Sequence, residues 1–173
     1  LIELGHRRIG YLGLGNRQRS NRLRRAGYVD ALAHAGLAAP GAQPGEVHNW
    51  IHIVPEAEMA SLSDTDAGTM HLLELLNRGP TAVLCYNDRT AAGALTACHR
   101  HGITVPEDLS LVGFDDIELA RWITPSLTSI RQPRAAMGRA AMEMLLQLLA
   151  GEAVENRLVA PELIARESTA VAG

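Results

Sequence analysis

The sequence predicts an α/β fold built on a doubly wound parallel sheet, and three observations lead to that prediction. Short apolar runs of strand length alternate with helical segments along the chain. Residues 81–86 form a continuous apolar run, which is typical of a strand buried on both faces of a parallel sheet. Polar residues follow the predicted strands at their carboxyl ends, which is the edge where sheets of this class bind ligands.

The first half of the chain predicts two strands and two helices. Residues 9–14 form a short β-rich run, and residues 20–36 follow as a helix with its small and apolar side chains roughly on one face. A segment rich in Pro and Gly, residues 40–45, leads to apolar positions between residues 47 and 54 that predict a second strand. Residues 66–76 then form an amphipathic helix.

The second half repeats the same unit twice. The strand of residues 81–86 is followed by Asn87 and Asp88, both of which can cap the helix that Gly102 ends. A further strand is predicted over residues 109–114. Three strand-helix units in series favour the doubly wound sheet over other α/β arrangements.

The remainder of the chain begins with an acidic pair, Asp115 and Asp116, and a short helix that reaches Trp122. A strand over residues 127–131 then precedes a helix whose apolar stripe runs along residues 137–148. Two short extended runs finish the chain, residues 157–160 and 162–165.

Composition excludes several classes of protein. The chain has a formal net charge of −3, with 47% hydrophobic and 20% charged residues, which is ordinary for a globular α/β protein and excludes disorder. It contains no apolar run long enough to span a bilayer. Cys85 and Cys98 have neither disulfide-framework nor zinc-ligand spacing, so we expect a protein of the reducing cytoplasm.

No catalytic motif is present, and we therefore predict that the protein is not an enzyme. His48 and His52 are four residues apart, but the stretch between them is predicted to be extended, so no metal site or cofactor is predicted. Residues 1–35 carry a net charge of +5, which raises the alternative of a nucleic-acid patch. The remaining residues carry −8 and contain no recognisable DNA-reading motif, which argues against that alternative.

Polar residues at two strand ends are candidates for ligand binding. Asn87 offers a carbonyl and an amide that together can bind two neighbouring hydroxyl groups, and Asp115 offers a carboxylate that accepts hydrogen bonds from hydroxyls. The alternative for Asn87 and Asp115 is a structural role as a helix cap. For Asp88, which also follows the strand of residues 81–86, we favour that structural role.

Several linked motifs follow one another along nearly the whole chain. In order, they are Leu-Gly5-His-Arg-Arg-Ile-Gly-Tyr-Leu12, Ser20, Arg24-x-x-Gly27-Tyr28, Pro80-Thr-Ala-Val, Asn87-Asp88-x-x-Ala-x-Gly93, Val105-Pro-Glu-Asp-Leu-Ser, Val112-Gly-Phe-Asp-Asp116, Pro125-x-Leu-Thr-x-Ile-Arg-Gln-Pro133-x-x-x-Met-Gly138 and Arg166-Glu-Ser-Thr169. Together these motifs make the chain resemble the C-terminal part of the LacI/GalR family of bacterial transcription regulators. The last two motifs favour these repressors over their periplasmic sugar-binding relatives.

The resemblance implies a type I periplasmic-binding-protein-like effector domain with two α/β subdomains around a cleft. In that family the residues matching Arg24, Asn87 and Asp115 line the small-molecule site. Many members carry a stacking aromatic residue where this chain has Ser63, which is a departure from the pattern.

The resemblance also implies a division into subdomains, with the N-terminal subdomain mostly missing. Residues 1–126 would form the C-terminal subdomain, residues 127–151 a return segment of the N-terminal subdomain, and residues 152–173 the final strands returning to the C-terminal one. The helix of the return segment cannot bury its apolar stripe within such a chain, so we expect it to pack on another chain or on a missing lobe.

We therefore predict the effector-binding and dimerisation part of a LacI-type regulator, responsive to a sugar or related metabolite. It would be a homodimer that contacts operator DNA only through an N-terminal headpiece absent from this chain. The predicted dimer face uses the helix from about Thr90 to His101 and the corner at Trp122 and Ile123.

The alternatives to this regulator function are a solute-binding protein of a sugar ABC transporter and a purely oligomerising module. The sequence does not identify the effector or the operator. It also does not show whether the effector acts as an inducer or as a corepressor.

Overall fold

The computed structural model describes residues 1–15, 19–37 and 50–173. The strands are β1 (Ile9–Leu14), β2 (Ile51–Val54), β3 (Ala82–Cys85), β4 (Ser110–Asp115), β5 (Thr128–Arg131) and β6 (Glu162–Ile164). The helices are α1 (Arg19–His34), α2 (Asp64–Leu76), α3 (Asp88–Arg100), α4 (Leu119–Trp122) and α5 (Arg134–Leu149). No described helix is both long and apolar enough to cross a membrane.

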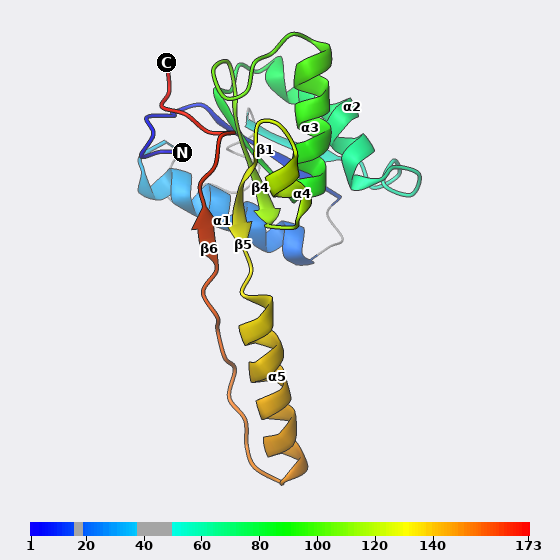
Figure 1. Ribbon diagram of the computed structural model, residues 1–173, viewed down its shortest axis with the longest axis vertical. Coiled ribbons are helices and arrows are strands. Elements are labelled where there is room, and N and C mark those ends of the chain that lie inside the picture. The colour runs from blue at the N-terminus through cyan, green and yellow to red at the C-terminus, as the bar shows by residue number, and fades with distance from the viewer. Residues whose placement is uncertain (16–18, 38–49) are drawn as a thin grey trace.

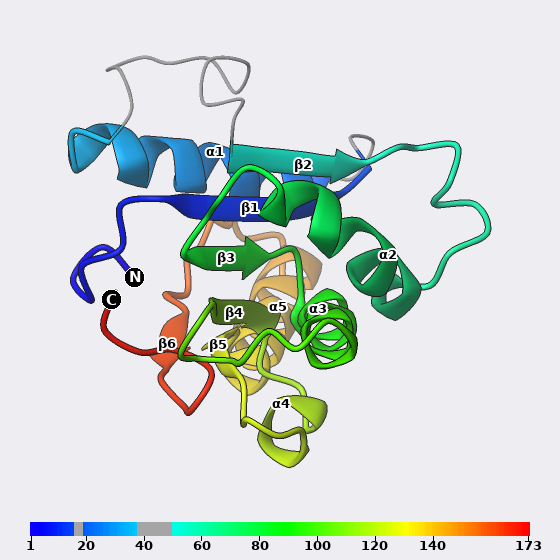
Figure 2. The same ribbon diagram turned by 90° about the horizontal axis from the view of Figure 1, so that it is seen from above.

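The strands form one sheet in the order β2-β1-β3-β4-β5-β6. The first five are parallel, and β6 pairs antiparallel with β5 (Figure 2). The strand order reverses beside β1, because the chain moves from β1 outward to β2 and then returns to the other side of β1 with β3. Such a reversal is the point at which doubly wound sheets bind ligands, outside the carboxyl ends of the strands.

Helices cover both faces of the sheet, which confirms the doubly wound class. Consecutive residues of β1 point to opposite faces: Tyr11 packs with Tyr28 and Leu32 of α1, whereas Leu12 packs with Leu72 of α2. The second face carries the larger core, which α2 and α3 cover together with Leu127. The two faces therefore draw on alternating residues of the same strands.

Two glycines allow α2 and α3 to pack closely. A methyl group on Gly68 would collide with the backbone carbonyl of Thr90, and one on Gly93 would collide with the carbonyl of Thr65. The two helix backbones approach each other at these positions because neither glycine has a side chain.

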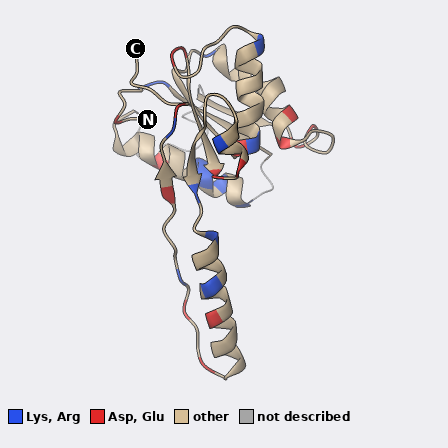
Figure 3. Ribbon diagram, viewed as in Figure 1, with Lys and Arg blue, Asp and Glu red and all other residues tan. Residues whose placement is uncertain are grey.

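Helix α5 leaves the body as an arm (Figure 1). None of its residues is buried, and few of them are charged (Figure 3). The expectation that this chain alone cannot bury the apolar stripe of the helix is therefore confirmed. Large apolar side chains are exposed along it, at Met137, Met142, Leu145, Leu146, Leu148 and Leu149.

Two expectations need correction. The strand of residues 127–131 was assigned to the return segment, but β5 pairs with β4 along residues 128–131, and Leu127 is fully buried in the core of this sheet. Burial of Leu127 against α2 and α3 keeps the strand in this lobe. Residues 157–160 form no strand, and only β6 does so in the final segment. The Pro- and Gly-rich segment at 40–45 lies outside the described residues.

Candidate ligand-binding site

Arg24 and Asp115 meet at the carboxyl edge of the sheet. A terminal nitrogen of the Arg24 guanidinium lies 3.2 Å from Oδ1 of Asp115, and the two side chains are 16% and 29% exposed. The other terminal nitrogen donates a hydrogen bond of 2.6 Å to the backbone carbonyl of Tyr86, just beyond β3. The guanidinium also stacks 3.8 Å above the ring of Phe114. These contacts hold the charged group of Arg24 in one orientation.

Asp115 is held at its side chain and its backbone. Gln132, directly after β5, donates a 2.5 Å hydrogen bond from Nε2 to Oδ1 of Asp115. Arg134, in the first turn of α5, donates to the backbone carbonyl of Asp115 at 2.9 Å. The backbone of Asp115 has φ of 105°, a conformation that an Asp residue adopts only when its surroundings impose it. The carboxylate is thus fixed at the edge of the sheet and stays partly open to solvent.

Asn87 follows β3, next to the strand that ends in Asp115, and it is the N-cap of α3. Its Oδ1 accepts hydrogen bonds of 2.9 Å from the backbone N–H and from the hydroxyl of Thr90. Its Nδ2 donates to Oδ2 of Asp64 at 2.6 Å. The carbonyl therefore has a structural role, and the amide reaches the start of α2 at the same edge.

Asp88 is not the cap that the sequence favoured. It is the first residue of α3, only 1% exposed, and its carboxylate accepts from the Ser129 hydroxyl and from the backbone N–H of Ile117 at 2.8 Å. Burial raises its pKa, against the effect of these hydrogen bonds. Asn87 provides the cap of α3. The Asp88 carboxylate instead links α3 to β5 and to the segment after β4.

Asp116 is a structural residue, unlike its neighbour Asp115. Its carboxylate is buried and forms ion pairs with Arg131, at 2.7 Å, and with Arg166. Burial alone would raise the pKa of Asp116, but the hydrogen bonds from Arg166 and Arg131 outweigh burial and hold that pKa below its ordinary value. The acidic pair at the end of β4 is thus divided between the interior and the site.

Sequence reasoning missed Gln132 and Phe114 as site residues. Both carried a usable signal, since Gln132 directly follows β5 and Phe114 directly precedes Asp115. Ser63, where the family pattern has an aromatic residue, is the N-cap of α2 and accepts a hydrogen bond from the backbone N–H of Asp66.

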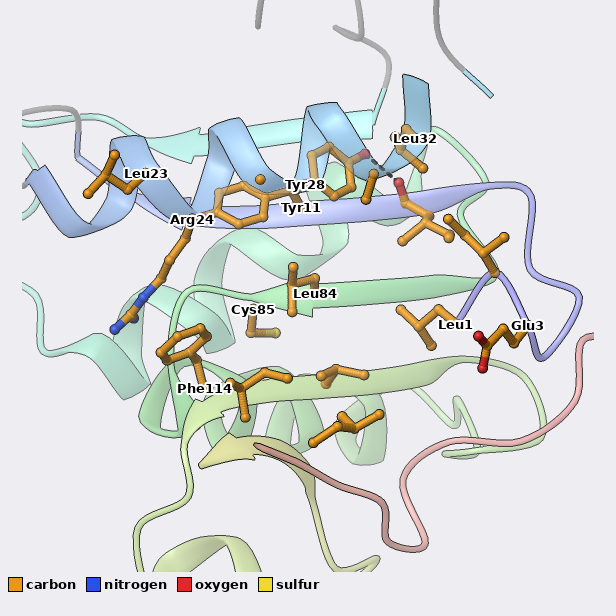
Figure 4. A pocket seen from close by; sticks show the side chains of 17 residues that line it. Leu1, Glu3, Tyr11, Leu23, Arg24, Tyr28, Leu32, Leu84, Cys85 and Phe114 are labelled. Atoms are coloured by element: carbon orange, nitrogen blue, oxygen red, sulfur yellow. Dashed lines mark hydrogen bonds between the residues drawn. The ribbon is translucent and has the colours of Figure 1, made fainter. Parts of the chain in front are cut away.

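An apolar hollow of about 530 Å³ lies between α1 and the sheet and adjoins the polar groups at the strand ends (Figure 4). Its walls include Leu23, Tyr28 and Leu84, and Arg24 and Phe114 stand at one end of it (Figure 4). Because its lining is almost wholly apolar, the hollow does not suit a ligand rich in hydroxyl groups. The polar groups at the strand ends, Arg24, Asp115 and Gln132, suit such a ligand better.

Comparison with known proteins is consistent across sequence and structure. The family model of the periplasmic binding protein-like domain matches residues 1–169. The HTH-type transcriptional regulator GalS of Salmonella typhimurium is 39% identical over 98% of this chain and 47% of its own length. The chain spans about half the length of the curated relatives it matches.

Two solved structures share the fold. The lac repressor dimer, solved bound to operator and the anti-inducer ONPF, has a TM-score of 0.79 and 33% identity over 98% of this chain and 55% of its own. A LacI family regulator from Enterococcus faecium with bound ribose has a TM-score of 0.80 and 27% identity, and the match covers 100% of this chain and 60% of that one. All three proteins are transcription regulators by name.

Proposed function

Because the chain belongs to the periplasmic binding protein-like domains of LacI/GalR-type regulators, we propose that it is the effector-binding and dimerisation part of such a regulator. The effector would be a sugar or a related polyhydroxylated metabolite. The protein would act in the cytoplasm, where its DNA target lies, and it would carry out no catalysis.

The observation that carries this proposal is the pairing of Arg24 and Asp115 at the carboxyl edge of the sheet next to the strand-order reversal, because Arg24 follows β1 and Asp115 ends β4, on the far side of β3. A fixed guanidinium and a fixed carboxylate side by side offer donors and acceptors to adjacent hydroxyl groups, and the Gln132 amide adds a third group. Phe114 contributes an apolar ring at the same point, beneath the guanidinium. Convergent polar groups beside an aromatic ring are typical of carbohydrate-sized ligand sites.

The position of the arm, helix α5, is evidence for a second lobe opposite this site. Gln132 and Arg134 contact Asp115 and stand at the base of α5, so the arm leaves the body beside the ligand groups. We propose that residues 134–151 pack in the other subdomain and that the effector binds between the two. An effector that contacts both lobes favours one arrangement of them, and that preference would change the spacing of DNA headpieces in a dimer.

The dimer surface proposed from the sequence is open in the single chain. Trp122 is 80% exposed, so packing within the chain does not account for this aromatic side chain, and Leu119 beside it is also exposed. Exposed tryptophans of this kind frequently anchor a protein partner. We propose that α3 and α4 form the surface on which a second copy docks.

The test is a binding screen on the full-length protein by isothermal titration calorimetry. A panel of pentoses, hexoses, disaccharides and nucleosides identifies the effector, and Asp115→Asn is then compared with the exposed control Asp30→Asn. We expect Asp115→Asn to weaken binding by about 1.5–3 kcal/mol, the scale of a hydrogen bond to a charged group. Unchanged affinity would remove Asp115 from the site.

The transporter alternative predicts a different result. A solute-binding protein would bind sugar without any effect on DNA, whereas a regulator changes its operator affinity when the effector is added. The names of the relatives support the regulator. A gel-shift titration with the promoter region of the protein's own gene separates the two functions.

A further inference from the structure

Two histidines and two glutamates meet between the edge strand β2 and helix α2, on the opposite side of β1 from Asp115 in the strand order. His52 comes from β2, His71 and Glu74 from α2, and Glu58 from the segment that joins them. Nε2 of His52 lies 3.1 Å from Nδ1 of His71, and Nδ1 of His71 lies 4.0 Å from Oε1 of Glu74. The ligand-binding site described above uses none of these side chains.

The local structure explains why these residues converge. His71 and Glu74 are three residues apart on a helix, so their side chains share one face. His52 pairs in register with Leu12, whose side chain points to the core under α2. The histidines are therefore brought together by the packing of α2 on β2, and neither is an ordinary surface residue. They are 8% and 5% exposed.

Packing alone leaves this cluster poorly satisfied. The two imidazole rings share one hydrogen bond, to which one ring contributes a proton and the other a lone pair. Nε2 of His71 is buried and has no aligned hydrogen-bond partner among the described residues, although Oε2 of Glu58 lies 3.0 Å away. A buried ring nitrogen in that situation is costly unless another group engages the histidine.

We propose that His52, His71 and Glu74 form a binding site for a divalent transition-metal ion of the zinc class. One donor atom from each of the three residues lies within 4.8 Å of the other two. The 3.1 Å between the two ring nitrogens suits two ligands that each lie about 2.0–2.1 Å from one ion. Two imidazoles and one carboxylate favour zinc over magnesium or calcium, which take oxygen ligands.

Glu58 then has a defined role as the partner of a ligand. When His71 binds the ion through Nδ1, its proton lies on Nε2, and the Glu58 carboxylate, 3.0 Å from that nitrogen, is placed to accept it after a small rotation of the Glu58 side chain. Such a hydrogen bond would orient the ring and strengthen the lone pair on Nδ1. Glu74 is 63% exposed, so an ion can enter from solvent and keep a water molecule as a further ligand. The bound ion would fasten α2 to the edge strand of the sheet.

The test measures zinc binding to the full-length protein after chelator treatment and removal of any affinity tag. We expect one Zn²⁺ per chain at this site by calorimetry, and a rise in Tm on adding the ion, because a ligand of the folded state stabilises it. Co²⁺ serves as the spectroscopic probe, since its visible absorption reports a low-coordinate nitrogen and oxygen site. Mg²⁺ at the same concentration is expected to raise Tm much less.

The variants are Glu74→Gln, which changes an exposed side chain and leaves folding intact, and His52→Gln, which removes a buried ligand. Both are expected to weaken Zn²⁺ binding at least tenfold, and Glu58→Gln about tenfold as an outer partner. The matched controls are His34→Gln and Glu107→Gln, because both residues are exposed and lie outside the proposed zinc site and dimer surface. Zinc binding that is absent from the wild-type protein, or equal in Glu74→Gln and the controls, would overturn the proposal.

Discussion

Arg24 and Asp115 are 91 residues apart in the sequence, yet their charged groups lie 3.2 Å apart at the carboxyl edge of the sheet. The partners come from different strand-helix units, on either side of β3. The pair exists only because the strand order brings the start of α1 next to the end of β4. The pair is partly exposed, while Arg131 and Arg166 form their ion pairs with the neighbouring Asp116.

Arg24→Lys is expected to weaken effector binding about tenfold or more and to change the free energy of unfolding by less than about 1 kcal/mol. Lysine keeps the charge but loses both the planar stacking on Phe114 and the second donor that reaches Tyr86. A partly exposed ion pair contributes little stability. Calorimetry and urea unfolding measure the two effects, with Arg19→Lys as the control. Equal losses of affinity in both variants would contradict a role for Arg24 in binding.

Asp116→Asn is expected to lower the free energy of unfolding at pH 7 by about 3 kcal/mol, because it leaves Arg131 and Arg166 without their buried partner. The native pKa of Asp116 lies below its ordinary value. Its stabilising contribution is therefore complete above the ordinary carboxyl pKa of about 3.9 and is lost as the pH falls through the native value.

Urea unfolding of wild type and Asp116→Asn between pH 7 and pH 3 tests this dependence. We expect the difference between the two proteins to be constant near neutrality and to shrink in acid. Asp30→Asn, on the exposed side of α1, serves as the control. A difference that grows as the pH falls would show that the sign of the pKa shift is wrong.

Gly93→Ala is expected to destabilise the protein by about 1–3 kcal/mol, since its methyl group would collide with the backbone carbonyl of Thr65 and push α2 from α3. Gly27→Ala in α1 is the matched control, because nothing lies within 4 Å of the added methyl group. Alanine's helix propensity makes that variant neutral or up to about 1 kcal/mol more stable. Thermal unfolding of both variants gives the comparison, and similar Tm values would argue against the close helix contact.

Trp122→Ala is expected to raise the dimer dissociation constant of the full-length protein at least 30-fold, corresponding to about 2 kcal/mol for an interface anchor. Its side chain is 80% exposed in the single chain, so the monomer should lose little stability. Analytical ultracentrifugation over a concentration series measures the equilibrium, with exposed Val171→Ala as the control. A wild-type protein that remains monomeric throughout would refute the proposed surface.

Leu149→Ala separates the two environments proposed for α5. In the 173-residue chain this side chain is 77% exposed, and we expect its removal to change stability by no more than about 0.5 kcal/mol. In the full-length protein we expect a loss of about 2 kcal/mol or more, because the leucine would be buried in the second lobe. Denaturant unfolding of the variant in both contexts tests this. Equal small effects would place the arm in solvent in the intact protein.

Much of the fold was predictable from local pattern. The run over residues 81–86 and the alternation of strands and helices led to the parallel sheet, and most element boundaries fall within two residues of the prediction. These features depend on short-range periodicity, which one segment carries by itself. The position of Asn87 and Asp115 at the carboxyl edge was likewise predictable, because residues directly after buried strands reach that edge, whereas their role in ligand binding stays a prediction.

The sequence by itself determined the class of sheet, the apolar stripe of α5 and the placement of polar residues at strand ends. Only the tertiary structure decided that β5 stays in this lobe, that Asp116 is buried while Asp115 faces solvent, and that His52 meets His71 rather than a neighbour in sequence. The physical reason is that these outcomes depend on the strand order and on which helix packs over which strand. Such contacts join residues distant in sequence, and no local spacing encodes them.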